Sequence, residues 1–310
     1  MKVGIIGVGA VGTSCAKAML LRGSCHEIVL VDKKARRAQG VAADLSHGAV
    51  LCPPTKILAG NYEDLAGADI VVITAGKNEK AGKATNPKDK RGRLRLLGPN
   101  ARIYKQIIPL LKRHARYATI LVVTDPPDPL ADIVRQRTKT NPVLSSGTFL
   151  DTLRFRLQLA ERLECHPSSV DAVVVGEHGT SQVYVWSSAQ VGGVPVLSYA
   201  AQKGLNLKSF QSDVERAVKF ANINIIKGTG ASQHGIGIVT ARLVEAILRD
   251  EGLVAPIGKY HQKFRVTLSL PAVIGHGGVS KVLMPSLSAK ESEALAKSAA
   301  AIREALARLA

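Results

Sequence analysis

The sequence is poor in cysteine, in aromatic residues and in long apolar runs. Its four cysteines, Cys15, Cys25, Cys52 and Cys165, form no Cys-x-x-Cys pair, which argues against a zinc knuckle or a disulfide framework and predicts reduced thiols and no metal site. An uninterrupted apolar run of about 18 residues is also absent, so no transmembrane helix is predicted. The apolar stretch after Lys2 superficially resembles a signal peptide, but its glycines follow a phosphate-binding pattern. We therefore expect a globular cytoplasmic protein.

Acidic residues are outnumbered, because 42 lysines and arginines against 24 aspartates and glutamates give a formal net charge of +18. This excess is unusual for a metabolic enzyme and raises the question of a polyanion partner. Aromatic residues make up only 4% of the chain, however, which leaves few platforms on which bases could stack. We expect a solvated basic surface together with a functional anion site, and no nucleic-acid or membrane partner.

A glycine pattern near the N-terminus lies between a short apolar strand and a segment with helical spacing. In Gly7-Val-Gly9-Ala-Val11-Gly12 the first glycine permits a tight turn, the second lets the backbone approach a pyrophosphate, and the third allows close helix packing. This context makes the pattern a specific signal. It predicts a dinucleotide site that includes Gly7, Gly9, Val11 and Gly12.

A carboxylate ends the second predicted strand, at residues 27–32. Asp32 follows Gly12 by about twenty residues, where its side chain can accept hydrogen bonds from both hydroxyls of an adenosine ribose. This arrangement favours NAD. The basic run at 33–37 would suit the 2′-phosphate of NADP, but Asp32 would repel that phosphate, so NADP is the weaker alternative.

Two further strands are predicted: residues 69–76, which end in small residues, and residues 118–123, which run into Thr124-Asp125-Pro126. In an open parallel sheet a cofactor passes over these carboxyl ends. The residues placed there are Thr74, Ala75, Gly76 and Val123. Strands alternating with helical segments predict an α/β fold with a doubly wound parallel Rossmann sheet in residues 1–145, followed by a mixed α+β substrate domain in residues 146–310.

One histidine lies between glycines directly after an apolar run, in the segment Gly176-Glu-His-Gly179. His178 can work as a proton donor at neutral pH. Asp151 and Arg154 are three residues apart, which puts a carboxylate and a guanidinium on one helix face. A loop histidine and a helix-surface ion pair are the simpler alternatives for these residues.

Taken in order, these motifs resemble those of the NAD-dependent L-lactate and malate dehydrogenases, including the L-2-hydroxyisocaproate dehydrogenase branch. The resemblance covers essentially the whole chain. It rests on Gly7-Val-Gly-Ala-Val-Gly12, Asp44-Leu-Ser-His-Gly48, Ile73-Thr-Ala-Gly76, Arg93-Leu-Arg-Leu-Leu97, Ser146-Gly-Thr-Phe-Leu-Asp-Thr-Leu-Arg-Phe155, Gly176-Glu-His-Gly179 and Leu270-Pro-Ala-Val-Ile-Gly275.

The resemblance implies reversible hydride transfer between the nicotinamide of NAD and C2 of a 2-oxo or L-2-hydroxy acid. His178 would donate the proton to the forming alkoxide, and Asp151 would orient the imidazolium. Arg154 would bind the substrate carboxylate through two parallel hydrogen bonds. The charged, glycine-containing segment 77–95 resembles the active-site lid, in which Arg93 would polarise the substrate carbonyl and Arg91 is a competitor for that role.

Three of the positions that depart from the family pattern belong to the candidate site. Asp125 replaces an asparagine beside the reacting oxygen, where an ionised carboxylate would repel an alkoxide or raise the pKa of His178. Glu79 occupies the position of the glutamine of lactate dehydrogenases or the arginine of malate dehydrogenases, and a carboxylate there disfavours oxaloacetate. The sequence does not identify the substrate, but it favours one whose side chain is larger than methyl. Ser232 replaces a threonine that lines the substrate side-chain pocket, and a helix cap is an equal alternative.

The partners follow from the same resemblance: a small-molecule 2-oxo or 2-hydroxy acid, and a second copy of the chain. The segment 44–48 resembles the helix at which family members pair, so a homodimer or homotetramer is expected. Malate dehydrogenase activity is the nearest alternative. A degenerate member that binds NAD or a polyanion with little turnover is the other.

Overall fold

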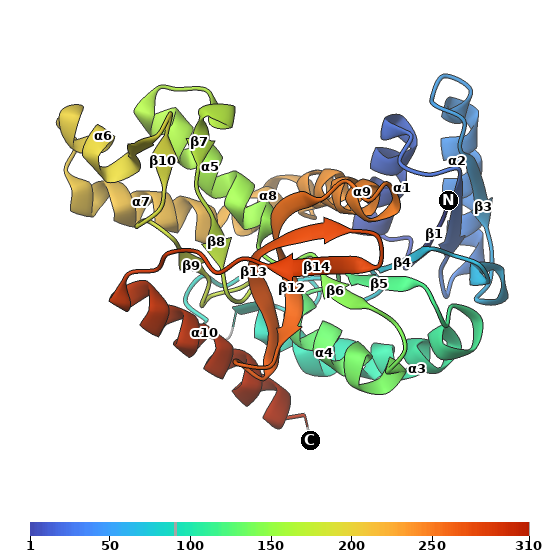
Figure 1. Cartoon of the computed structure of the whole chain (residues 1–310). Coiled ribbons are helices and arrows are strands. Elements are labelled where there is room, and N and C mark those ends of the chain that lie inside the picture. The colour runs from blue at the N-terminus through green and yellow to red at the C-terminus, as the bar shows by residue number, and fades with distance from the viewer. Residues whose placement is uncertain (90–91, 310) are drawn as a thin grey trace.

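The computed structural model describes residues 1–89 and 92–309. In this part of the chain the central sheet has nine strands in the order β14-β13-β12-β6-β5-β4-β1-β2-β3 (Figure 1). The six strands from the first half pair with one another in parallel and have the doubly wound order 3-2-1-4-5-6. They are β1 (Lys2–Ile6), β2 (Glu27–Val31), β3 (Lys56–Ala59), β4 (Ile70–Ile73), β5 (Thr119–Val122) and β6 (Val143–Ser145). The predicted Rossmann sheet is confirmed.

Helices cover both faces of this sheet, and the strand sequences explain why. Every residue of β4 is buried, as expected for a parallel strand with apolar neighbours on both sides. Side chains alternate between faces, so Ile5 packs with one cluster and Ile6 with the other. One face is covered by α1 (Ala10–Arg22), α2 (Ala35–Ala49) and α9 (His234–Leu248), and the other by α3 (Leu97–His114) and α4 (Pro127–Thr138).

Three antiparallel strands from the second half extend the same sheet beyond β6: β12 (Leu253–His261), β13 (Val266–Gly275) and β14 (Gly278–Val282). The junction is the pair Gly258 and Ser145. A Cβ atom at Gly258 would collide with the side chains of Ser145 and Asp128, so this close approach of strands requires glycine. The two halves therefore share one sheet, and the boundary after residue 145 stays a prediction.

The rest of the second half forms a mixed lobe beside the sheet, at the upper left of Figure 1. Its core contains an edge-to-face aromatic cluster in which Phe155 lies 4.9 Å from Trp186 between ring centroids. The elements are α5 (Phe149–Leu163), β7 (Val170–Asp171), β8 (Val174–Val175), β9 (Val183–Tyr184), β10 (Gln190–Val191), β11 (Val194–Pro195), α6 (Val196–Gln202), α7 (Leu207–Lys219) and α8 (Ala221–Thr229). This confirms the predicted α+β character.

The last helix, α10 (Ala289–Ala307), begins with a capping box between Ser288 and Glu291. The described residues also contain three short 3-10 helices: η1 (Glu63–Leu65), η2 (Gly92–Leu96) and η3 (Pro167–Ser169). The four cysteines are free thiols. Within residues 1–89 and 92–309, no helix combines the length and apolar character needed to cross a membrane.

Candidate active site

Two adjoining cavities lie at the carboxyl ends of β1, β4 and β5, where open α/β sheets bind ligands. One has an empty volume of about 1150 Å³ and is lined by the glycine turn, Asp32 and Ala75. The other has an empty volume of about 650 Å³ and is lined by His178, Arg154 and Arg93. Thr74 and Gly76 line both cavities, so a ligand can extend from one into the other.

The first cavity fits a dinucleotide. Gly7 has a φ of +96°, and a Cβ atom there would collide with Ala75 of the neighbouring strand end. A Cβ atom at Gly12 would collide with the carbonyl oxygen of Gly7, whereas Gly9 faces open space. The backbone at Gly9 is therefore accessible to a pyrophosphate, and the other two glycines permit the turn and the helix packing predicted for them.

Asp32 is fixed at the far end of the same cavity. Its two carboxylate oxygens accept hydrogen bonds from the backbone N–H groups of Val8 at 2.8 Å and Lys34 at 2.9 Å. Each oxygen retains a further lone pair for a ribose hydroxyl. Lys33 and Arg37 also line this cavity, so the basic run lies beside the carboxylate, as the sequence suggested.

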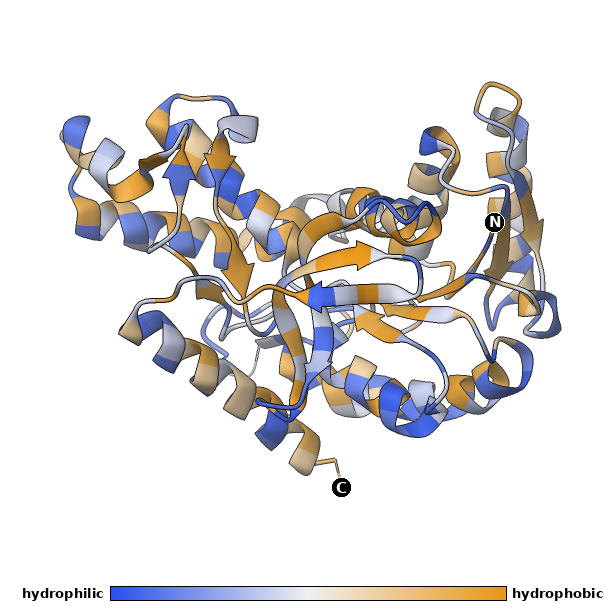
Figure 2. Cartoon of the chain, viewed as in Figure 1, coloured by the Kyte–Doolittle hydropathy of each residue, from blue (hydrophilic) through white to orange (hydrophobic). Residues whose placement is uncertain are grey.

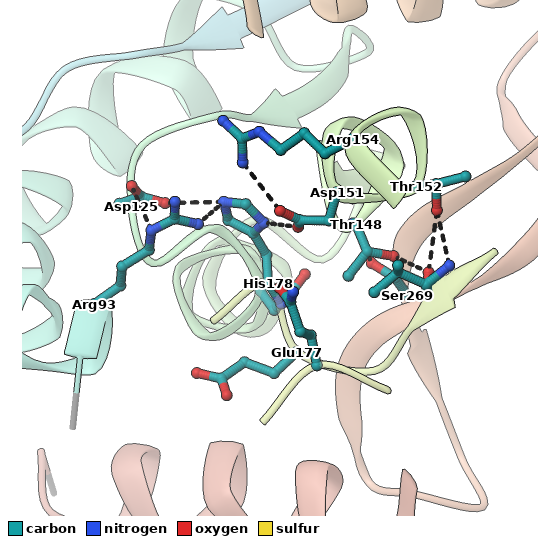
Figure 3. A network of polar contacts seen from close by, with 12 residues as sticks. Arg93, Asp125, Thr148, Asp151, Thr152, Arg154, Glu177, His178 and Ser269 are labelled. Carbon is teal, nitrogen blue, oxygen red and sulfur yellow. Dashed lines mark hydrogen bonds and ion pairs between the residues drawn. The ribbon is translucent and has the colours of Figure 1, made fainter. Parts of the chain in front are cut away.

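His178 follows β8 and lies at the centre of a polar network (Figure 3). Gly176, with a φ of +88°, pairs with Ser269 of β13 and turns the chain into the site. The imidazole is largely buried; its Nδ1 atom is hydrogen-bonded to Asp151 and its Nε2 atom to Arg93. Asp125 Oδ1 lies 3.7 Å from Nε2. The predicted acid and its orienting carboxylate are therefore in direct contact.

Asp151 and Arg154 lie on the inner face of α5. Arg154 Nη1 donates to Asp151 at 3.1 Å, and the two side chains are only 13% and 3% exposed, so the helix-surface interpretation of this pair is wrong. Burial alone would raise the pKa of Asp151, but the charge and hydrogen bond of His178, with the charge of Arg154, hold that pKa below its usual range. Asp151 is therefore held as a carboxylate beside His178.

Arg93 of η2 reaches into the site. Its Nε atom lies 3.5 Å from Asp125 Oδ2. Burial opposes the charge on the guanidinium, but Asp125 and Glu79 outweigh this effect and raise the pKa of Arg93. Burial, followed by the charge of Asp125, raises the pKa of Glu79. Arg91, the competitor for the lid position, lies outside the described residues.

The second cavity thus gathers most of the predicted site. Ser232 lies before α9, whose N-cap is Gln233, and its hydroxyl accepts from Arg154 Nη2 at 3.5 Å, which places it in the substrate pocket and not at a cap. Asp151 contacts His178 on the side away from this cavity, and Gly12 packs against the carbonyl oxygen of Gly7. The predicted residues lining this cavity are Val11, Thr74, Gly76, Glu79, Arg93, Val123, Asp125, Arg154, His178 and Ser232.

Sequence reasoning missed two residues that support the site. Asn100 of α3 donates to the backbone oxygen of Asp125 at 2.6 Å and accepts from the backbone N–H of Lys77 at 2.7 Å, which links the segments that follow β4 and β5. Asp128 of α4 accepts from the backbone N–H of His178 at 2.8 Å and from the hydroxyl of Ser145. Burial raises the pKa of Asp128 to about 7.

This raised pKa predicts a pH-dependent stability. The folded protein retains the proton on Asp128 up to about pH 7, whereas an unfolded chain releases it near pH 4, so stability falls as the pH rises through this window. In Asp128→Asn, the amide can donate to Ser145 while its oxygen still accepts from His178. We expect the difference in unfolding free energy between about pH 5 and about pH 8, measured with urea, to shrink by roughly 2–3 kcal/mol in the variant. An unchanged difference would contradict this assignment.

A dehydrogenase acting on 2-hydroxy acids needs a dinucleotide cavity that opens onto a proton donor and a cation for the substrate carboxylate. This chain has that arrangement, and it is an oxidoreductase of this class. The family model described as the lactate/malate dehydrogenase NAD binding domain matches residues 1–144, and the lactate/malate dehydrogenase alpha/beta C-terminal domain matches residues 148–310. The chain belongs to the lactate/malate dehydrogenase family.

Similar proteins agree with this assignment. The L-lactate dehydrogenase of Deinococcus radiodurans is 38% identical over 304 residues, covering 98% of this chain and 97% of that protein. The L-lactate dehydrogenase of Thermus aquaticus is 39% identical over 312 residues, covering 98% of each. The crystal structure of a minor L-lactate dehydrogenase from Enterococcus mundtii superposes with a TM-score of 0.91 at 31% identity, covering 100% of this chain and 98% of that one. The resemblance to the hydroxyisocaproate branch stays a prediction.

Proposed function

We propose that this enzyme uses NADH to reduce a 2-oxo monocarboxylic acid to the L-2-hydroxy acid, and catalyses the reverse oxidation. The observation that carries the proposal is that His178 and Arg154 line one cavity adjoining the dinucleotide cavity. A proton donor and a carboxylate anchor are thereby brought to the same small space. Bound NADH supplies the hydride, and Val11, Gly76 and Val123 would contact its nicotinamide end.

Arg154 would bind the substrate carboxylate. Its guanidinium can form two parallel hydrogen bonds with a carboxylate, and a largely buried position strengthens them. Asp151 and Ser232 already contact the guanidinium and limit its rotation. The substrate is therefore anchored by a side chain whose orientation is set before binding.

His178 would transfer the proton at its Nε2 atom. Arg93 contacts this atom, so the carbonyl oxygen of the substrate must enter between the imidazole and the guanidinium. In that position the oxygen meets the proton donor on one side and a positive charge on the other. The ionised carboxylate of Asp151 is hydrogen-bonded to Nδ1, where it stabilises the protonated imidazole. After the proton has left Nε2, the same hydrogen bond keeps the remaining proton on Nδ1.

Three finer assignments belong to this proposal. Asp32 at the ribose end of the dinucleotide cavity favours NAD over NADP, although Lys33 and Arg37 lie close by. Homodimerisation through α2 is supported by Val50 and Leu51 at its end, which are 85% and 93% exposed and would be buried by a second copy. We assign the enzyme to the cytoplasm, where NADH and reduced thiols are maintained.

The test is a spectrophotometric screen of NADH oxidation against pyruvate, oxaloacetate, and branched, aromatic and basic 2-oxo acids. Glu79 lines the substrate cavity, and its carboxyl group offers no positive charge with which the second carboxylate of oxaloacetate could pair. We expect turnover of at least one monocarboxylic 2-oxo acid with a kcat/KM above that for oxaloacetate. Absence of turnover across the panel would leave a protein that binds NAD without catalysis.

Asp125 lowers the rate in this proposal, because its carboxylate lies beside the position where negative charge develops on the substrate oxygen. Asp125→Asn removes that repulsion and frees Arg93 from its ion pair, while the backbone oxygen of residue 125 can still accept from Asn100. We expect kcat/KM for 2-oxo acid reduction to rise about tenfold, which corresponds to about 1.4 kcal/mol. Steady-state kinetics measure the change, and a fall in kcat/KM would show that the carboxylate itself assists the reaction.

A further inference from the structure

A second charged site lies on the outer surface of α3 and α4, apart from the catalytic cavities. A groove between these helices has an empty volume of about 820 Å³. None of the residues that line it lines the substrate cavity or the dinucleotide cavity. The lining residues are Lys105, Ile108, Pro109, Lys112, Arg113 and Arg137.

Positive charge is segregated on this surface. Helix α3 carries Arg102, Lys105, Lys112 and Arg113 and no aspartate or glutamate. The acidic groups near the two helices already have partners, since Asp132 pairs with Arg135 at 3.2 Å and Glu63 lies 3.7 Å from His114. Within residues 1–89 and 92–309, no carboxylate lies within ion-pairing distance of the four cations in the groove.

The helix geometry places these cations on both walls of the groove. Lys105 and Lys112 are seven residues apart on α3, so they lie on one face about 10 Å apart along the helix axis. Arg113 is adjacent to Lys112, and Arg137 comes from the last turn of α4. Apolar residues of α3 form the remainder of the lining, and the outer surfaces of these helices are largely hydrophilic (Figure 2).

We infer that this groove binds a linear chain of phosphate groups, such as inorganic polyphosphate. Like charges without counter-charges repel one another, and an anion in the groove replaces this repulsion with attraction. A single phosphate reaches one or two of the cations, whereas a chain spans the distance between Lys105 and Lys112. The groove has no aromatic lining residue on which a base could stack, which favours a phosphate chain over single-stranded nucleic acid.

The experiment measures binding of fluorescently labelled polyphosphate by anisotropy across a range of salt concentrations. We expect Lys105→Gln/Lys112→Gln to weaken binding at least tenfold. We also expect this variant to reduce the slope of log affinity against log salt by about 1.4, since each phosphate contact contributes about 0.7 for a single-stranded polyanion. Thermal unfolding confirms that the variant remains folded.

The matched control is Lys208→Gln/Lys290→Gln, which removes the same two charges from exposed positions on α7 and α10. We expect this control to bind polyphosphate within twofold of the unmodified protein. An equal loss in both double variants would overturn the inference, because it would show a response to net charge alone. Single-stranded DNA of the same charge binding as tightly as polyphosphate would also overturn it.

Discussion

His178→Asn should lower kcat/KM for 2-oxo acid reduction by about 10³-fold, within the range usual for loss of a general acid. Asparagine cannot supply a proton to the forming alkoxide, and it cannot form the charged pair that a protonated imidazole makes with Asp151. His178 does not line the dinucleotide cavity. NADH binding, followed by the change in nicotinamide fluorescence, should therefore remain within a fewfold of the original value.

The matched control for this variant is His276→Asn, which makes the same chemical change at an exposed turn between β13 and β14. It should retain full activity. If His178→Asn keeps more than a tenth of the original kcat/KM, the proton must come from another group. Asp125, 3.7 Å from the imidazole, is then the group to replace next.

The parts of the fold that the sequence predicts are those determined by local backbone chemistry. Gly7 and Gly12 are required because a side chain would collide with neighbouring backbone, and this requirement appears directly as a spacing in the sequence. The uninterrupted apolar run of β4 likewise indicates a strand that is buried on both faces of the sheet. The extension of the sheet by β12 is different, since Gly258 and Ser145 are 113 residues apart and no local pattern indicates that they pair.

In the candidate site, too, local motifs identify residues, whereas contacts between distant segments could not be predicted. His178, Asp151 and Arg154 could be predicted because their motifs are compact, whereas the contact of Arg93 with His178 depends on where η2 packs in the folded chain. Asp128 was missed because a carboxylate in the first turn of a helix is an ordinary feature that favours the helix dipole. Only the structure shows that this carboxylate is buried and bonded to the backbone of the catalytic loop.

Substrate anchoring gives the second large effect, because Arg154→Lys keeps the positive charge but loses the planar fork. A lysine cannot form the two parallel hydrogen bonds to the substrate carboxylate. Loss of one charge-assisted hydrogen bond costs about 1.5–3 kcal/mol, so we expect kcat/KM to fall by about 10²-fold, mainly through a higher KM. Steady-state kinetics with the preferred 2-oxo acid measure this change.

Arg156→Lys provides the control on the same helix, since Arg156 lies outside the cavity and pairs with Asp171 at the surface at 2.9 Å. It should leave both kcat and KM unchanged. A lower kcat at constant KM in Arg154→Lys would mean that Arg154 acts on the reacting atoms through Asp151 and does not anchor the substrate. A rise in KM that leaves kcat nearly unchanged, absent from the Arg156 variant, places the substrate carboxylate on the guanidinium of Arg154 and fixes the orientation in which C2 meets His178.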